Sequence, residues 1–274
     1  MNHSFNSEAK RRVYEYWNEQ PCNLLLSDKE KFSKELFDEL ETQRYQIVPE
    51  ILNFADFEKY KNKKVLEIGV GLGIDFKRWI LAGAKSYGID LTNEAINYTK
   101  KCLQIYGLSA EELKVADAES LPYADNFFDV VYSWSTIQHT PDFKLALGEI
   151  VRVTCPGGIC KIMIYNRHSL NSVFQWFQHG LLKGKPFRKL ADVIEISEHN
   201  IGTKTFTRSE IECLLQSFPV ENIRIKTFLC HRDLLKHRNK ILQCLTKILG
   251  LLLGNKAGFF MTIEFNKIGN LAHV

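Results

Sequence analysis

Hydrophobic and polar residues follow two different rhythms along the chain. Over residues 8–60, apolar side chains recur every three or four positions, which is the spacing of amphipathic helices. After residue 64, short apolar runs alternate with segments of helical spacing, a pattern typical of a parallel sheet with right-handed crossovers. The runs predicted as strands are 65–68, 86–89, 113–115, 128–133, 159–165, 222–229 and 259–265, and helices are predicted over 73–82, 93–106, 142–154 and 207–217.

Two local signals mark where helices begin. Thr207 and Glu210 have the spacing of a capping box, in which each side chain bonds to the backbone of the other residue. Thr140 is the expected N-cap of the helix over 142–154, because Pro141 suits a first helical position.

These elements predict an α/β fold with a Rossmann-like, seven-stranded, mostly parallel sheet and helices on both faces. Residues 1–62 are expected to form a helical N-terminal cap or lid, and residues 63–166 and 206–274 the core. Residues 167–205 break the rhythm after strand five and are interpreted as an insertion that covers the substrate side. Its large aromatic residues are candidates to line an apolar pocket: Phe174, Trp176, Phe177 and Phe187.

Composition narrows the class of protein. The chain has 274 residues and 45% hydrophobic content, enough for one large core, and its net charge of +4 is too small to indicate a nucleic-acid binder. The seven cysteines form no C-x-x-C pair, so no metal site is expected. Their odd, scattered arrangement is typical of a reducing compartment, so a cytoplasmic location is expected. The N-terminus carries no apolar signal region, and no apolar stretch approaches the roughly 20 residues of a membrane span.

The most informative segment is the glycine-rich turn at residues 65–73, Val-Leu-Glu-Ile-Gly-Val-Gly-Leu-Gly. A strand that turns through glycines into a helix brings bare backbone N–H groups to a ligand, because glycine has no Cβ. A dinucleotide fingerprint, G-x-G-x-x-G, would need a third glycine at position 74 or 76. Those positions hold Ile74 and Phe76, so both frames fail.

Two acidic residues follow at the ends of the next two predicted strands. Asp90 lies 21 positions after Gly69, where a carboxylate can accept both ribose hydroxyls of an adenosine. Asp117 follows the third strand, where an acceptor can take the adenine amino group. The turn and the two acids therefore favour a site for an adenosyl compound.

The series of motifs resembles the class I methyltransferases that use S-adenosylmethionine. It runs from E-x-G-x-G-x-G at 67–73 through Asp90, Asp117 and the segments 125–142 and 149–158. The branch with the closest likeness contains ubiquinone/menaquinone C-methyltransferases and many small-molecule O- and N-methyltransferases. The resemblance covers about residues 63–166, and implies S-adenosylmethionine as cofactor and S-adenosylhomocysteine as product.

The same resemblance assigns cofactor-binding residues one by one. It implies that Gly69 and Gly71 line the methionine part, that Asp90 takes the ribose, that Asp117 with Ala118 holds the adenine edge, and that Ser133 forms the edge of the pocket. The expected cofactor-binding set is completed by Tyr16, Glu67, Gly73 and Leu91. Glu67 either bonds backbone near the cofactor or marks the end of its strand. Tyr16 belongs to an N-terminal helix that would close over the sulfonium, since aromatic faces attract cations; the alternative is packing of that helix on the sheet.

Two histidines are candidates for a catalytic base. His139 follows the fourth predicted strand and His168 the fifth, where open α/β sheets place their ligands. Many members of the resembling family have His-His where this chain has Gln138-His139, so no role of the first histidine carries over. His139 could equally be a helix-start histidine bonded to backbone.

The segment 231–253 is basic at its start and apolar afterwards. It is either a helix that rests on an anionic membrane, which would suit a lipidic acceptor, or a helix that packs on the core. The oligomeric state stays open at this point.

Three functions compete. The leading hypothesis is an enzyme that transfers a methyl group to an O, N or C atom of a small metabolite, hydrophobic acceptors included. An RNA or protein methyltransferase is disfavoured by the modest charge, and the segment 133–136 lacks the Asn/Asp-Pro-Pro-Tyr/Phe motif of amino-group methylation. A non-catalytic S-adenosylmethionine-binding protein would share the cofactor site without turnover.

Overall fold

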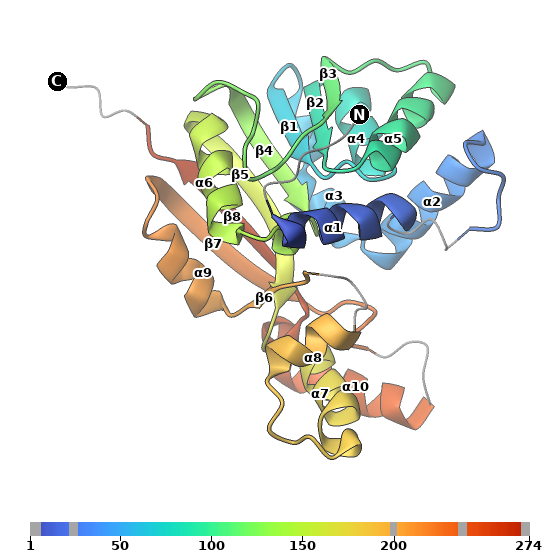
Figure 1. Cartoon of the computed structure of the whole chain (residues 1–274), viewed down its shortest axis with the longest axis vertical. Helices are drawn as coiled ribbons and strands as arrows, with labels where there is room; N and C mark the ends of the chain where they lie inside the picture. The colour runs from blue at the N-terminus through green and yellow to red at the C-terminus, as the bar shows by residue number, and fades with distance from the viewer. Residues whose placement is uncertain (1–6, 22–26, 198–201, 235–239, 270–274) are drawn as a thin grey trace.

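The structure, a computed structural model, describes residues 7–21, 27–197, 202–234 and 240–269. Its centre is one mixed sheet with the strand order β3-β2-β1-β4-β5-β8-β7 (Figure 1). Strands β1 to β5 run parallel along this path, whereas β8 is antiparallel to β5 and to β7. The strands are β1 Lys64–Ile68, β2 Lys85–Asp90, β3 Glu112–Val115, β4 Phe128–Trp134, β5 Thr154–Asn166, β6 Thr205–Phe206, β7 Val220–Phe228 and β8 Phe260–Lys267.

All seven predicted strands are confirmed, and the two-residue strand β6, parallel to β5, was not predicted. Strand β5 also begins earlier than expected. Thr154 already pairs with Phe128, and a register shift between Phe128 and Val130 on β4 accommodates the intervening turn residues.

Helices surround the sheet. They are α1 Glu8–Glu19, α2 Lys34–Ile47, α3 Glu50–Ala55, η2 Phe57–Tyr60, α4 Ile74–Leu81, α5 Asn93–Ile105, η3 Ile137–His139, α6 Phe143–Val153, α7 Leu170–His179, η4 Leu181–Lys183, α8 Leu190–Ser197, α9 Arg208–Leu215, α10 Lys240–Leu253 and η5 Gly254–Ala257. Helical structure over much of residues 8–60 is thereby confirmed.

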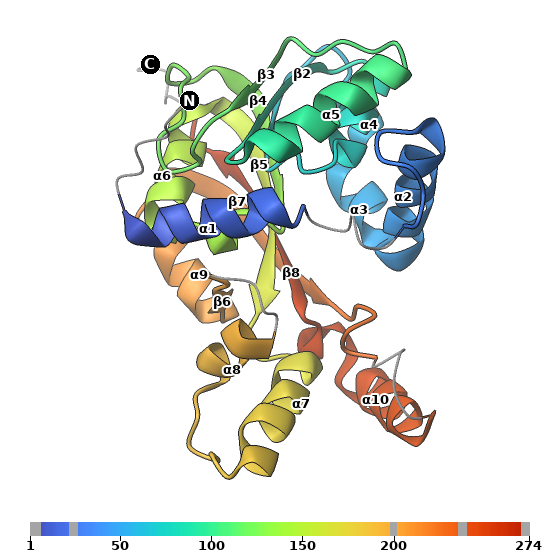
Figure 2. The same ribbon diagram turned by 45° about the vertical axis from the view of Figure 1, so that its right-hand side comes forward.

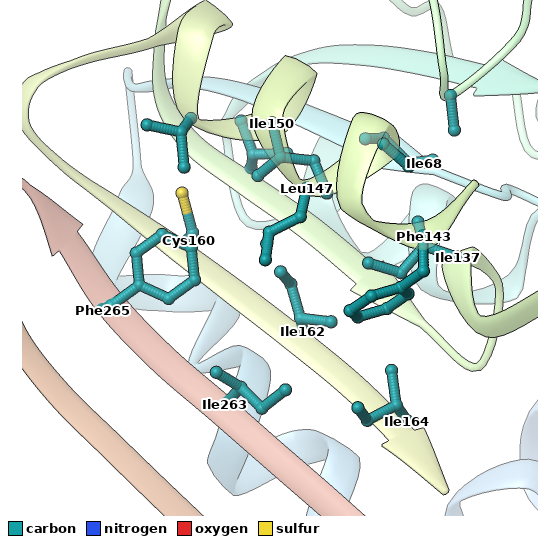
Figure 3. Close-up of a cluster of buried hydrophobic side chains, with 14 of the residues drawn as sticks. Ile68, Ile137, Phe143, Leu147, Ile150, Cys160, Ile162, Ile164, Ile263 and Phe265 are labelled. Carbon is teal, nitrogen blue, oxygen red and sulfur yellow. The ribbon is translucent and has the colours of Figure 1, made fainter. Parts of the chain in front are cut away.

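The two faces of the sheet carry separate cores because successive side chains of a strand point to opposite sides. Val131 belongs to the cluster under α6 and α9, and its neighbour Val130 to the cluster under α3 and α4. Figure 3 shows the first cluster, in which Leu147 of α6 faces Ile162 of β5 and Ile263 of β8.

The two predicted helix starts had different outcomes. The capping box of α9 is confirmed, since the Thr207 hydroxyl accepts from the Glu210 N–H and the Glu210 carboxylate accepts from the Thr207 N–H. The start predicted for α6 was wrong. Asp142, not Thr140, is the N-cap, and its carboxylate accepts from the Leu145 N–H. Asp142 is the better cap because a carboxylate also complements the helix dipole.

Beyond the carboxyl end of β5, helices α7, η4, α8, α10 and η5 form a separate projection, here called the distal lobe (residues 170–197 and 240–257). Figures 1 and 2 show it at the far end of the molecule, with α1 lying between it and the core. The predicted insertion is therefore helical. The expectation of an aromatic pocket there was wrong for Phe187, which is 98% exposed, and Phe177 is also exposed.

The single helix expected over 231–253 was also wrong at its start. Residues 231–234 form a turn, residues 235–239 lie outside the described part of the chain, and α10 begins at Lys240. Asp233 decides the turn because its buried carboxylate accepts backbone N–H groups of Cys230, Phe259 and Asn171. This one side chain therefore ties the end of β7, the start of β8 and the start of α7 together.

Candidate functional site

The glycine-rich turn between β1 and α4 combines close packing with one open position. Gly69, Gly71 and Gly73 all have positive φ, at 85°, 53° and 82°. A Cβ at Gly69 would lie 2.1 to 2.6 Å from atoms of Thr136, and one at Gly73 would lie 3.0 Å from the Thr99 backbone. A Cβ at Gly71 would meet nothing within 4 Å. Packing thus requires two of the glycines, whereas the third leaves its backbone open to a ligand.

Asp90 at the end of β2 is bonded directly to this turn. Its Oδ2 accepts the Gly71 N–H at 3.2 Å, and its Oδ1 accepts both the N–H and the hydroxyl of Thr92. Burial raises the pKa of Asp90, and these hydrogen bonds oppose the rise. A carboxylate offers about four lone-pair sites, so Asp90 retains capacity for a further donor from a ligand. Leu91 follows it, half-buried.

Glu67, the last charged residue of β1, is a buried carboxylate with an unsatisfied oxygen. It is 4% exposed, and its Oε2 has no hydrogen-bond partner among the described residues. Burial raises the pKa of Glu67 well above its ordinary value; the negative charge of Asp75 adds to the rise and the positive charge of Arg44 opposes it. Since an unpaired buried carboxylate is costly, a cationic or hydrogen-bond-donating ligand group would be favoured beside it.

Behind Glu67 lies a buried polar network that the sequence pattern did not reveal. Arg44 of α2 donates twice to Asp75 of α4, from Nε at 2.7 Å and from Nη2 at 2.5 Å. The hydroxyls of Tyr45 and Tyr132 also donate to Asp75. The network fastens the N-terminal helices to the helix that begins in the glycine-rich turn.

The acidic segment after β3 is paired with a lysine from α1. Lys10 Nζ lies 2.5 Å from Asp117 Oδ2 and 2.6 Å from Glu119 Oε2, and Lys10 is 3% exposed. Ala118, between the two acids, is buried at 8% exposure. Neither Lys10 nor Glu119 was expected from the sequence, because a lysine on an amphipathic helix ordinarily faces solvent.

Helix α1 also reaches the ends of β2 and β4. The Tyr14 hydroxyl accepts from the Asn93 side-chain amide, and Asn18 Oδ1 accepts from the Glu94 N–H at the start of α5. The Trp17 ring contacts the His139 ring edge-on at 5.1 Å, and Tyr16 contacts Trp17 at the same distance. Helix α1 therefore lies across the carboxyl ends of the parallel strands from β3 to β4 (Figure 2).

His139 lies in η3 beneath Trp17 and is 5% exposed. Its Nδ1 is 3.2 Å from the Thr203 hydroxyl, and its Nε2 is 3.4 Å from the Gln138 side-chain nitrogen. Burial lowers the pKa of His139 to about 3, with smaller contributions from the charges of Lys204 and Arg232. A neutral imidazole with so low a pKa is a poor base at neutral pH.

The other predicted residues are less central. His168 is exposed just beyond β5, and its backbone exchanges hydrogen bonds with the Asn166 side chain. Ser133 is fully buried and donates its hydroxyl to the Ile68 carbonyl, which joins β4 to β1.

In the described part of the chain, no group of His, Cys, Asp and Glu is arranged to hold a metal ion. Nor do those residues contain a helix long and apolar enough for a membrane crossing.

A family model described as "Methyltransferase domain" matches residues 66–162. A malonyl-acyl-carrier-protein O-methyltransferase from Pectobacterium atrosepticum is 31% identical over 115 residues, 42% of this chain and 44% of that protein. The chain spans less than half the length of the first curated relatives that it matches. A demethylmenaquinone methyltransferase from Bacillus mycoides is 26% identical over 222 residues, 73% of this chain and 92% of that protein.

Among solved structures, the phosphoethanolamine N-methyltransferase 2 of Haemonchus contortus superimposes with a TM-score of 0.63 at 16% identity. The superposition covers 93% of this chain and 60% of that one. At this identity the likeness concerns the fold alone. Over residues 66–162 and the sheet that carries them, the chain is similar to the class I S-adenosylmethionine-dependent methyltransferases.

Proposed function

We propose that this protein transfers a methyl group from S-adenosylmethionine to an O, N or C atom of a small, hydrophobic metabolite. One observation carries the proposal. The open backbone at Gly71, the half-buried Asp90 bonded to it and the unsatisfied carboxylate of Glu67 lie together at the carboxyl ends of β1 and β2. Open α/β sheets bind their ligands at this edge.

The residues present fit the cofactor. The Glu67 carboxylate would receive the ammonium group of its methionine part, beside backbone of Gly69 and Gly71. Asp90 would accept from the ribose, with Leu91 beside it, and the segment Asp117–Ala118 would hold the adenine edge. Gly73 and Ser133 support the site from within the packing. When bound, the cofactor supplies a sulfonium-activated methyl group for in-line displacement.

The protein's own task is then to position the acceptor and exclude water. Helix α1, including Tyr16 and Trp17, would cover the site. The low pKa of His139 speaks against a role as general base and favours a structural role, in which the neutral, buried imidazole packs beneath Trp17. His168 remains the alternative candidate base because it is exposed beyond β5. Acceptors that are already nucleophilic need no base.

The small hydrophobic acceptor is supported by relatives named for demethylmenaquinone, tocopherol and a fatty acid. We further propose a cap of residues 1–62, a core of 63–166 and 206–274, and an insertion of 167–205. The six described cysteines are unpaired, which supports a reducing, cytoplasmic location.

A matched pair of glycine variants tests the cofactor site. Gly71 and Gly107 both have positive φ and open space where a Cβ would stand. The backbone strain of Gly71→Ala and Gly107→Ala should therefore be similar, about 1 kcal/mol each. In calorimetric titrations with S-adenosylhomocysteine, we expect Gly71→Ala to weaken binding about tenfold or more and Gly107→Ala to leave it unchanged. Equal affinities of the two variants would contradict the site, and an absence of binding by the unaltered protein would overturn the proposed function.

The acceptor is then found with labelled cofactor. The protein, S-adenosylmethionine with an isotopic methyl group and fractionated lipid, quinone and fatty-acid extracts are incubated together, and labelled products are separated. Label in an apolar small molecule is expected. Label in RNA or protein would replace the substrate class, and cofactor binding without any labelled product would indicate the non-catalytic binding protein.

A further inference from the structure

Exposed apolar side chains gather on the distal lobe. More than half of the large apolar side chains that are exposed in the described residues belong to this lobe, although it is a minor part of the chain. Scattered exposed leucines need no explanation, but a concentration on one projection marks an interaction surface. They are Val173, Phe177, Leu181, Leu182, Phe187, Ile248, Leu249, Leu252 and Leu253.

The tip between α7 and α8 alternates apolar and basic residues. Leu182 is 66% exposed and Phe187 is 98% exposed, so most of the surface of both side chains is in solvent. Lys183, Lys185 and Lys189 stand between and beside them, and all three are exposed. Exposed aromatic and leucine side chains flanked by lysines are suited to the boundary between lipid headgroups and acyl chains.

Helix α10 presents a second apolar face at the same end of the molecule (Figure 2). Its inner face is settled by packing, since a Cβ on Gly250 would lie 2.9 Å from Leu229 and the Thr246 hydroxyl donates to the Leu234 carbonyl. Leu252 lies on the opposite side of the helix and is 76% exposed. The outward face of α10 is thus apolar, and Lys247 and Lys256 beside it are exposed.

The charge of the lobe indicates the partner. The sequence contains no Asp or Glu over residues 170–191 or 234–263, and the acidic residues of the lobe are Asp192 and Glu195, both on α8. A second copy of this surface would bring lysine against lysine, which disfavours self-association. Nucleic acid would satisfy the lysines but leave the leucines and Phe187 without apolar partners. An anionic bilayer offers both phosphates and acyl chains.

We propose that the distal lobe docks on an anionic lipid bilayer, with Leu182, Phe187 and the outward face of α10 entering the headgroup boundary and the exposed lysines pairing with lipid phosphates. This docking does not depend on the proposed methyl transfer. If both hold, a hydrophobic acceptor would reach the carboxyl edge of the sheet directly from the bilayer.

Vesicle co-sedimentation of the full chain tests the docking. Vesicles of phosphatidylcholine alone are compared with vesicles of phosphatidylcholine and phosphatidylglycerol, and we expect retention by the anionic vesicles. Leu182→Ser/Phe187→Ser and Lys183→Glu/Lys185→Glu should each weaken binding about tenfold or more. The matched control is Lys144→Glu/Leu145→Ser on α6, where Leu145 is 49% exposed and Lys144 is exposed; it should bind like the unaltered protein.

Phe187→Trp keeps the test independent of folding defects, because the substitution keeps an exposed aromatic side chain. Its fluorescence should shift to shorter wavelength with anionic vesicles and stay unchanged with neutral ones. The proposal is overturned if neither vesicle retains the unaltered protein, or if the lobe variants and the control bind alike. Light scattering that shows a dimer lost in Leu182→Ser/Phe187→Ser, without vesicle binding, would assign the surface to self-association instead. Calorimetry with S-adenosylhomocysteine on the same samples separates these outcomes from the cofactor site.

Discussion

Lys10 Nζ of α1 lies 2.5 Å from Asp117 Oδ2, and this contact closes the N-terminal helix over the segment that follows β3. Burial lowers the pKa of Lys10, but the hydrogen bonds to Asp117 and Glu119 outweigh it, so the pKa is raised overall. The ion pair therefore contributes its full stabilisation below the ordinary lysine pKa, and the contribution is lost as pH rises through the higher pKa of the folded state. Docking of α1 and access to the segment after β3, where we propose that the adenine binds, are thus one structural event.

We predict that Lys10→Met detaches α1. Removing the cation leaves two acids beside each other without a counter-ion, which costs about 3 kcal/mol for a buried pair. Hydrogen exchange over residues 8–19 should accelerate accordingly. The control is Arg11→Met, since Arg11 is exposed and its pairs with Glu8 and Glu15 are screened by solvent. Unchanged protection of α1 in Lys10→Met would show that the other contacts suffice.

Acid should destabilise the protein through His139. Its pKa is lowered to about 3 in the folded state, so the unfolded chain takes up this proton first once pH falls below about 6.5. The stabilisation is complete above that pH and declines towards pH 3, by about 2 kcal/mol between about pH 7 and pH 5. Urea unfolding at the two pH values should show this loss in the unaltered protein and a smaller loss in His139→Gln. His168→Gln, at an exposed position, should retain the full loss; equal losses in both variants would refute the assignment.

The pair of Arg44 and Asp75 should behave as a coupled unit. Arg44→Met leaves the Asp75 carboxylate, whose side chain is 1% exposed, without its cation, and we expect a loss of about 3 to 5 kcal/mol in the free energy of unfolding. The double variant Arg44→Met/Asp75→Asn removes the stranded charge and should recover part of that loss. Denaturant titrations of the two single variants and the double variant measure the coupling. Strictly additive losses would mean that the two side chains act separately.

Asp233 should hold the base of the distal lobe. Asp233→Ala leaves three buried backbone N–H groups without an acceptor, at about 1 to 3 kcal/mol for each. We expect faster proteolysis of the segment 170–197 in this variant. Asp192→Ala, an exposed substitution on α8, is the matched control and should be cleaved like the unaltered protein. Equal cleavage of both variants would show that the lobe is held by packing alone.

The strands, most helices and the glycine-rich turn were predictable because their signals are local. Apolar runs, helical spacing and the Thr207–Glu210 capping box depend on residues a few positions apart, so they can be recognised in the sequence alone. Asp90 was predictable for a similar reason: it ends the strand next to the turn, and the parallel crossover brings the two ends together.

The helix starts that were predicted wrongly show the limit of such local signals. Thr140 and Asp142 are both acceptable N-caps. Asp142 is the N-cap in the structure, and its backbone N–H donates a hydrogen bond to the Glu119 carboxylate from a distant loop. The helix expected from residue 231 gives way to a turn because the Asp233 carboxylate accepts the backbone N–H groups of Asn171 and Phe259, in two distant segments, and of the nearby Cys230. In both places a long-range partner overrode local preference.

The amino-acid sequence by itself determined the order of strands and helices, the glycine-rich turn after the first strand, and the acids at the first strand ends. Tertiary structure alone decided which side chains those acids meet. Lys10 finds Asp117 across 107 positions and Arg44 finds Asp75 across 31. Tertiary structure also leaves one oxygen of Glu67 without a hydrogen-bond partner beside the turn. It exposes the apolar tip of the distal lobe to solvent. The physical reason is that pairing and burial depend on distances in space, which periodicity along a chain does not encode.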